Sequence, residues 1–239
     1  MKKIVQAALF AGLLLAGCAE KKSEHNTLSR TEKEEGWQLL FDGETTDGWH
    51  GYLKKSVGEG WKAEDGLLVC LGKGGDIGGD ILTNESFDNF ILSLEWNIAK
   101  GGNSGIFYHV IEDEKYSAPY ATGPEYQLID DIGFESPLEE WQKTGADYAM
   151  YTANDTKKLN PAGEWNTSKI VFDHGHVEHW LNGNKIIEFT AWSDDWKKLK
   201  AESKWKAYPD YGTAKTGPVG LQDHGHAITF RNIKIKPLD

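Results

Sequence analysis

The 239-residue sequence has little cysteine, methionine or proline, with only 2, 2 and 7 residues of each. Two cysteines cannot form the disulfide framework that supports small secreted domains. Basic residues are also scarce: 26 Lys and Arg against 37 Asp and Glu give a net charge of −11. This balance repels a phosphate backbone, so we expect no nucleic-acid partner. With 39% hydrophobic and 26% charged residues, the chain is neither disordered nor a multi-span membrane protein.

A long apolar run occurs at the N-terminus, where two lysines precede residues 4–16. This pattern is typical of a secretory signal peptide and is short for a bilayer span. The run ends in Leu-Ala-Gly-Cys at 15–18, which resembles the lipobox of bacterial lipoproteins. The resemblance implies a signal peptide over residues 1–17, lipidation of Cys18 and a charged tether over 18–36. It also implies a place in the bacterial cell envelope, on the periplasmic face or cell surface, and on the outer membrane if the source is diderm. Membrane contact would then be through the lipid alone.

Once Cys18 is lipidated, Cys70 is the remaining thiol, and we expect it to be buried and unpaired.

Short segments rich in β-branched and aromatic residues, separated by turn signals, predict an all-β sandwich in a single domain over residues 37–239. The clearest segments are 66–70, 90–96, 105–110, 169–172 and 228–235. Asn182-Gly183 tolerates the positive φ angles of a tight turn and predicts a hairpin between 176–181 and 185–189. Most of the ten tryptophans lie in or beside these segments or near the predicted helix, so we expect them mainly to pack rather than to stack on a ligand.

A single short surface helix is predicted after the hairpin. Ser193, Asp194 and Asp195 can cap a helix that runs from Trp196 to about Lys206.

Several motifs occur in a consistent order from about Trp37 to Leu238. They include Leu-Phe-Asp-Gly at 40–43, Asn-Ser-Gly-Ile-Phe-Tyr at 103–108, Gly-Pro-Glu-Tyr-Gln at 123–127, Glu-His-Trp-Leu-Asn-Gly at 178–183, Ser-Lys-Trp at 203–205 and Gly-Leu-Gln-Asp-His-Gly at 220–225. Together they resemble the bacterial 3-keto-disaccharide hydrolase family. The resemblance implies a concanavalin A-like jelly-roll β-sandwich of two antiparallel sheets, with a carbohydrate site on the concave face. It also implies cleavage of glycosides already oxidised at C3.

A ketone at C3 acidifies the hydrogen on C2. A base can therefore remove that proton, and the substituent on C1 can leave by β-elimination; direct hydrolysis is the alternative. Elimination needs a base, an acid and a group that stabilises the enolate.

The residues for this chemistry follow from strand alternation, which puts Glu125 and Gln127 on one face of a strand. Alternation also separates His179 from its two neighbours and pairs Gln222 with His224. We predict Glu125 and His179 as the acid–base residues, because carboxylate and imidazole groups can both transfer protons. The predicted substrate-binding residues are Asn103, His109, Gln127, Gln222, His224 and Arg231. His109 stands where the family resemblance leads us to expect Arg at least as often. Alternatively, some of these side chains only hold loops.

Asp-His-Gly-His occurs at 173–176 and 223–226, and the spacing of the histidines suggests a metal site. Each copy is also a glycine-centred turn, so we predict no metal and no other cofactor. Structural calcium, at Asp42, Glu44 and Asp47 for example, is the alternative.

The predicted partner is a carbohydrate. The alternatives to an enzyme are a non-catalytic carbohydrate-binding lipoprotein and a scaffold lipoprotein. A two-carboxylate glycosidase is disfavoured, since no Glu-x-Asp-x-Glu run occurs.

Overall fold

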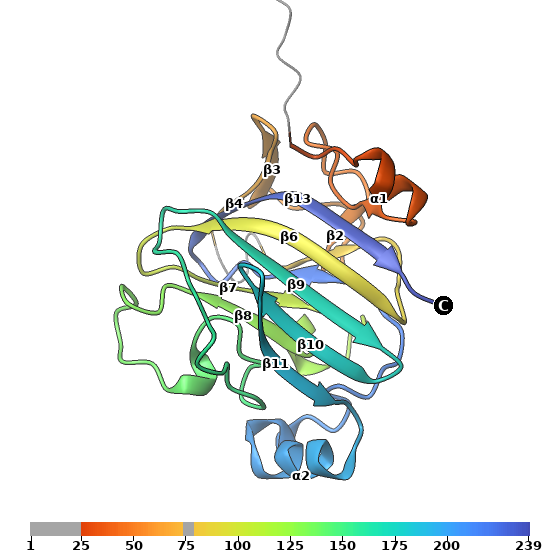
Figure 1. The fold of residues 1–239 in the computed structure, drawn as a ribbon. Coiled ribbons are helices and arrows are strands. Elements are labelled where there is room, and N and C mark those ends of the chain that lie inside the picture. Colours follow the sequence, from red (N-terminus) through yellow and green to blue (C-terminus); the bar gives the residue numbers. More distant parts are fainter. Residues whose placement is uncertain (1–24, 74–78) are drawn as a thin grey trace, which may run out of the picture.

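A computed structural model of the chain describes residues 25–73 and 79–239. They form a sandwich of two antiparallel sheets (Figure 1). The larger sheet has the order β11-β10-β9-β6-β13-β4-β3, with β1 paired to β13, and the smaller has the order β2-β5-β12-β7-β8. The predicted all-β fold of two antiparallel sheets is confirmed. The predicted signal peptide and Cys18 lie outside the described residues.

The larger sheet consists of β1 (Gln38–Leu39), β3 (Trp61–Glu64), β4 (Leu67–Leu71), β6 (Phe90–Ile98), β9 (Asn166–Asp173), β10 (His176–Leu181), β11 (Asn184–Thr190) and β13 (Ala227–Pro237). The smaller sheet consists of β2 (Trp49–Gly51), β5 (Ile81–Thr83), β7 (Asn103–Phe107), β8 (Glu125–Ile129) and β12 (Gly220–Leu221). The helices are α1 (Arg30–Glu34) and α2 (Asp194–Glu202), with 3₁₀ turns η1 (Pro119–Ala121), η2 (Glu140–Gln142) and η3 (Lys204–Ala207). All five predicted strands are present. β7 ends at Phe107 rather than at residue 110, because His109 adopts a left-handed φ of 51°.

The core lies between the two sheets and is built by alternation. Along β6 every second side chain is buried over nine residues. Trp96, near its C-terminal end, is fully buried and donates a 2.9 Å hydrogen bond from Nε1 to Ser168 Oγ. From the smaller sheet, Tyr126 and Leu128 of β8 belong to the same core. Glu125 and Gln127 therefore lie on the outer face of that sheet, as the alternation of β8 predicts.

The predicted helix is present with different limits. Ser193 caps α2 by accepting a hydrogen bond from the Trp196 backbone N–H, as predicted. α2 begins at Asp194 and ends at Glu202, not near Lys206. It ends there because Ser203 is extended, with φ −88° and ψ −179°, and starts the separate turn η3. In Figure 1, α2 lies at the end of the molecule opposite α1.

The segment from Asn26 to Glu34, which belongs to the predicted tether, is docked on the larger sheet. Asn26 and Asn232 exchange two hydrogen bonds between backbone N–H and side-chain oxygen, at 2.7 and 2.8 Å. Asn26 also donates to Gly66 O, and Glu32 of α1 forms an ion pair with Lys234 of β13. A buried asparagine and an ion pair thus hold this part of the predicted tether against the domain.

Cys70 is free and buried, as predicted, and burial raises the pKa of its thiol to about 12. Among the described residues, no helix has both the length and the apolar character needed to cross a membrane.

The β10–β11 hairpin provides a test of the turn chemistry. Asn182 and Gly183 have φ angles of 47° and 80°, and a Cβ at Gly183 would meet nothing within 4 Å. Replacing Gly183 by Ala therefore acts on backbone conformation alone, and we expect a loss of about 1 kcal/mol in the free energy of unfolding. Urea unfolding measures it. Gly183→Asn is the matched control, because Asn tolerates this conformation; equal losses for both variants would contradict the turn explanation.

Candidate functional site

A hollow of about 160 Å³ lies on the outer face of the smaller sheet. Strands β7 and β8 and the segment after β12 supply its amide and acidic side chains, while η1, η3 and loops supply the rest. Its lining residues are Asn103, Tyr120, Glu125, Gln127, Tyr148, Lys204, Gln222 and His224. Five of the eight predicted site residues are thus brought together: Glu125, Asn103, Gln127, Gln222 and His224.

Gly105 makes room for the carboxyl group of Glu125. In the β7–β8 register Gly105 pairs with Gln127, and Phe107 pairs with Glu125. A Cβ on Gly105 would lie 2.2 Å from Glu125 Oε1, a distance that no real contact allows. Since Gly105 lacks a side chain, the carboxyl group can lie across β7.

The environment of Glu125 favours its protonated form. Burial raises the pKa of this carboxyl group to about 8, and the positive charge of Lys204 opposes the shift. The negative charges of Asp80 and Asp147 add to the increase. At neutral pH Glu125 therefore holds its proton, as a general acid must before it acts.

Lys204 enters the hollow from η3 and is held by aromatic packing. The Trp205 ring stacks on Tyr211 at 4.0 Å between centroids, and Trp205 Nε1 donates a 2.7 Å hydrogen bond to Tyr148 O. The Lys204 ammonium lies 4.5 Å from the centre of the Tyr148 ring and 4.4 Å from that of Trp205. Burial lowers the pKa of Lys204, while the coulombic interaction with the Glu125 carboxyl group raises it.

Three amide oxygens at the hollow are buried and have no hydrogen-bond partner among the described residues. They are Asn103 Oδ1, Gln127 Oε1 and Gln222 Oε1. A buried polar atom without a partner costs about 1–3 kcal/mol. These oxygens are suited to accept hydrogen bonds from the hydroxyl groups of a ligand.

The structure does not bring His179 together with Glu125. His179 is fully buried between the two sheets, with its ring 4.7 Å from that of Tyr126. Its Nδ1 lies 3.1 Å from Gly145 O, and burial lowers the pKa of the ring to about 4. Alternation separates His179 from its neighbours, but the face that it occupies points into the core. The geometry therefore gives no support to its predicted catalytic role.

His109 and Arg231 also lie outside the hollow. His109 Nε2 is 2.8 Å from Asp88 O, and its ring packs 4.3 Å from that of Phe172, so it holds a loop. Arg231 donates from Nε to Glu95 at 2.7 Å and stacks 3.9 Å over Trp165, in the larger sheet. These contacts account for both side chains without a ligand, so the geometry gives no support to their predicted substrate contacts.

Lys204, Tyr148 and Tyr120 are lining residues that the sequence did not identify as site residues. Lys204 belongs to the Ser-Lys-Trp motif, which was a usable signal. No local pattern marks the two tyrosines, because Tyr120 reaches the hollow from the short turn η1 and Tyr148 from a loop.

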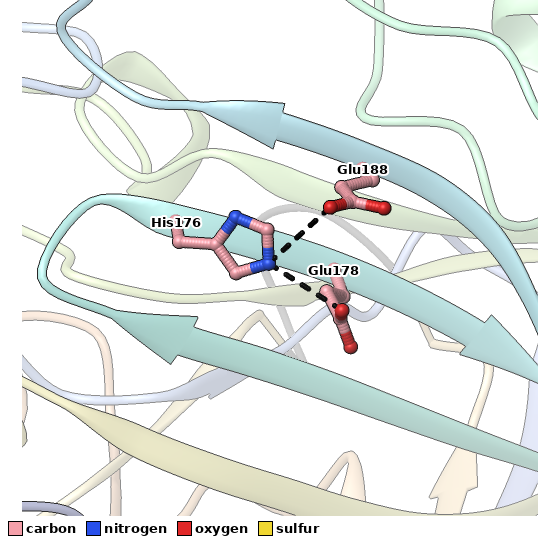
Figure 2. Close-up of side chains that lie close together, drawn as sticks. All are labelled: His176, Glu178 and Glu188. Carbon is pink, nitrogen blue, oxygen red and sulfur yellow. Dashed lines mark hydrogen bonds and ion pairs between the residues drawn. The ribbon is translucent and has the colours of Figure 1, made fainter.

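The first Asp-His-Gly-His segment joins β9 to β10 within the larger sheet, whereas the second joins β12 of the smaller sheet to β13 of the larger. His176, at the start of β10, lies near Glu178 and Glu188 (Figure 2). Its Nε2 is 3.4 Å from Glu178 Oε1 and 3.6 Å from Glu188 Oε1. Lys185 Nζ also contacts both carboxylates, at 3.1 Å for Glu178. The cluster is thus an ion-pair network at a partly exposed surface, where such pairs typically contribute little.

Asp42, the first oxygen ligand of the calcium alternative, has its carboxylate engaged in the turn itself. It accepts hydrogen bonds from the backbone of Glu44 and Thr45 and from the Thr45 hydroxyl.

Comparison with known proteins relates the whole domain to enzymes of sugar metabolism. A family model described as the 3-keto-alpha-glucoside-1,2-lyase-like domain matches residues 36–236. A 3-keto-disaccharide hydrolase of Bacteroides thetaiotaomicron is 33% identical, over 92% of this chain and 84% of that protein. The crystal structure of a candidate glycosyl hydrolase from Parabacteroides distasonis matches with a TM-score of 0.84 and 46% identity, over 90% of this chain and all of the other. A second candidate hydrolase of that species matches with a TM-score of 0.66 and 26% identity, over 84% and 99% of the two chains.

The raised pKa of Glu125 makes the stability of the fold depend on pH. Between pH 4.5 and about 8 the folded chain keeps a proton that the unfolded chain has lost, so rising pH favours unfolding. Glu125→Gln removes this contribution, which reaches at most about 1.4 kcal/mol per pH unit. We expect the variant to gain stability relative to the wild type as pH rises from 5 to 8, measured by urea unfolding. Glu64→Gln, at an exposed position, should show no such gain; parallel curves for wild type and Glu125→Gln would disprove the shift.

Proposed function

The chain belongs to the 3-keto-alpha-glucoside-1,2-lyase-like family, and we propose that it is a glycoside-cleaving enzyme that acts on sugars oxidised at C3. The observation that carries this proposal is the grouping of Glu125, Lys204 and three unpartnered amide oxygens in one hollow. Elimination from a 3-keto sugar requires a base, an acid and a group that stabilises the enolate. Glu125 and Lys204 are suited to the last two roles, and the amide oxygens are suited to hold the ring.

In the proposed reaction the oxidised ring occupies the hollow of Glu125. His224, exposed at the rim of the hollow, removes the proton from C2, and the electron pair forms an enolate with the C3 oxygen. The Lys204 ammonium stabilises that negative charge. As the enolate collapses, the bond between C1 and the leaving oxygen breaks, and Glu125 donates its proton to that oxygen.

The elimination product has a double bond between C1 and C2, conjugated with the C3 ketone. Addition of water at C1 and return of a proton to C2 then complete a net hydrolysis. Asn103, Gln127 and Gln222 bind ring hydroxyl groups through their unpartnered oxygens and so orient the ring for both steps.

A carbohydrate-binding protein without activity is the second candidate. It would need the amides and the tyrosines but no desolvated carboxylic acid. The burial of Glu125 beside Lys204 favours the enzyme, since desolvating a titratable group without a use for it lowers stability.

The decisive experiment incubates the protein with 3-keto and unoxidised disaccharides in parallel, followed by mass spectrometry of the products. We expect cleavage of the 3-keto substrates alone. Glu125→Gln should lower kcat about 10²- to 10⁴-fold, because the general acid is lost. Glu178→Gln, at a partly exposed ion pair outside the hollow, is the matched control and should retain activity. Binding of both substrates without cleavage of either would refute the enzyme.

The same reaction in D₂O separates elimination from direct hydrolysis. Elimination exchanges the C2 hydrogen, so the 3-keto product carries deuterium at C2, whereas direct displacement by water retains hydrogen there. If the product keeps hydrogen at C2 at early reaction times, the enzyme still cleaves the substrate but does not use elimination.

We also propose that Cys18 carries the lipid anchor and that the domain lies in the bacterial cell envelope. The support is the lipobox sequence at 15–18, which follows a signal-like apolar run. Cys18→Ala should move the protein from the membrane fraction to the soluble fraction and abolish incorporation of labelled palmitate. Cys70→Ala should leave both unchanged, since Cys70 is a buried thiol of the domain. Membrane association that survives Cys18→Ala would argue against the anchor.

A further inference from the structure

A second hollow of about 610 Å³ adjoins the hollow of Glu125. The two share three lining residues, Tyr120, Gln222 and His224. Ligand sites typically have volumes of about 300–1,000 Å³. The smaller hollow alone falls below this range, so it accommodates only part of a disaccharide-sized ligand.

We propose that the larger hollow is the subsite for the leaving group, and that it selects a neutral or cationic sugar over an anionic one. This inference rests on the proposed function and extends it to the second sugar of the substrate.

Gln222 marks the junction of the two hollows. Gln222 is only 8% exposed and lines both hollows. Its Oε1 atom has no hydrogen-bond partner among the described residues. His224, the proposed base, also borders both spaces. A glycosidic bond that lies at this junction would have the oxidised ring on the side of Glu125. The released sugar would lie in the larger hollow.

Two carboxyl groups give the larger hollow its chemical preference. Asp80 and Asp223 both line it, and the Asp223 backbone N–H donates a 2.9 Å hydrogen bond to Asp80 Oδ1. Burial raises the pKa of Asp80 to about 7, and the charge of Asp223 adds to the increase. In their carboxylate form these groups accept hydrogen bonds from sugar hydroxyls and attract an ammonium group, whereas they repel a uronic acid or a phosphate. Among the lining residues of this hollow, Lys54 is the basic lysine or arginine side chain, and it is exposed.

Aromatic side chains give this hollow surfaces for a sugar ring. Tyr52 and Tyr120 line it and pack on a separate apolar cluster of Leu82, Phe107 and Val110 on the outer face of the smaller sheet. This cluster thus fixes the two rings, and aromatic rings can pack against the apolar face of a sugar. The hollow of Glu125 differs in charge, because it contains Lys204 and a protonated carboxyl group.

The test compares three substrates with the same oxidised ring. Their leaving groups are methanol, a neutral sugar and a uronic acid. Ser117, exposed and lining only the larger of the two hollows, is replaced by Trp to fill it. We expect Ser117→Trp to raise KM for the neutral disaccharide about tenfold, and to change kcat/KM for the methyl glycoside far less. The retained cleavage of the methyl glycoside also shows that the variant is folded.

Asp80→Asn tests the charge preference. Its amide oxygen can still accept the hydrogen bond from Asp223, so the loop is retained while the negative charge is removed. We expect the ratio of kcat/KM between the uronic acid substrate and the neutral disaccharide to rise about tenfold. Asp47→Asn, at an exposed position that does not line either hollow, is the control and should leave the ratio unchanged.

The outcomes separate the two proposals. A wild-type protein that cleaves none of the three substrates refutes the proposed function itself. Cleavage of the methyl glycoside, with an unchanged KM of Ser117→Trp for the disaccharide, overturns the leaving-group subsite alone. An unchanged ratio in Asp80→Asn overturns the charge preference.

Discussion

The desolvation of one carboxyl group, that of Glu125, is the constraint on which the site depends. A buried carboxylate without strong compensation costs several kcal/mol, and the group avoids this cost by keeping its proton. Gly105 provides the space for this carboxyl group, and the positive charge of Lys204 opposes the rise in its pKa. The resulting acid is strong enough to donate to an alkoxide leaving group and weak enough to stay protonated at neutral pH.

The position of Lys204 shows how distant packing supports this chemistry. Lys204 belongs to η3, which begins where Ser203 breaks the helical path of α2. A stack of Trp196, Tyr211 and Trp205 then anchors this turn to the sandwich. These tryptophans, which the sequence placed among the packing residues, thus act on the site indirectly by fixing the ammonium group of their neighbour.

Strand alternation allowed the sequence to predict which side chains share a face, and five of the eight predicted site residues gather in the hollow. Alternation cannot tell which face is the core. His179 follows the predicted alternation and nevertheless points between the sheets, because the sheet that carries β10 turns this face toward Tyr126. His109 and Arg231 have side chains suited to bind a sugar, but each contacts a partner that only the folded chain brings near. Tyr120, Tyr148 and the docking of Asn26 depend on loop paths and on contacts between residues far apart in sequence, for which no local pattern exists.

Gly105 is a position at which one added carbon atom would alter the site. A methyl group there would displace the flexible end of Glu125, yet it would leave the backbone of β7 and the three amide oxygens in place. Such a chain would keep the amide oxygens that we propose bind the sugar and would displace the carboxyl group that we propose as the acid. In the proposed mechanism, position 105 of β7 therefore controls cleavage separately from sugar binding.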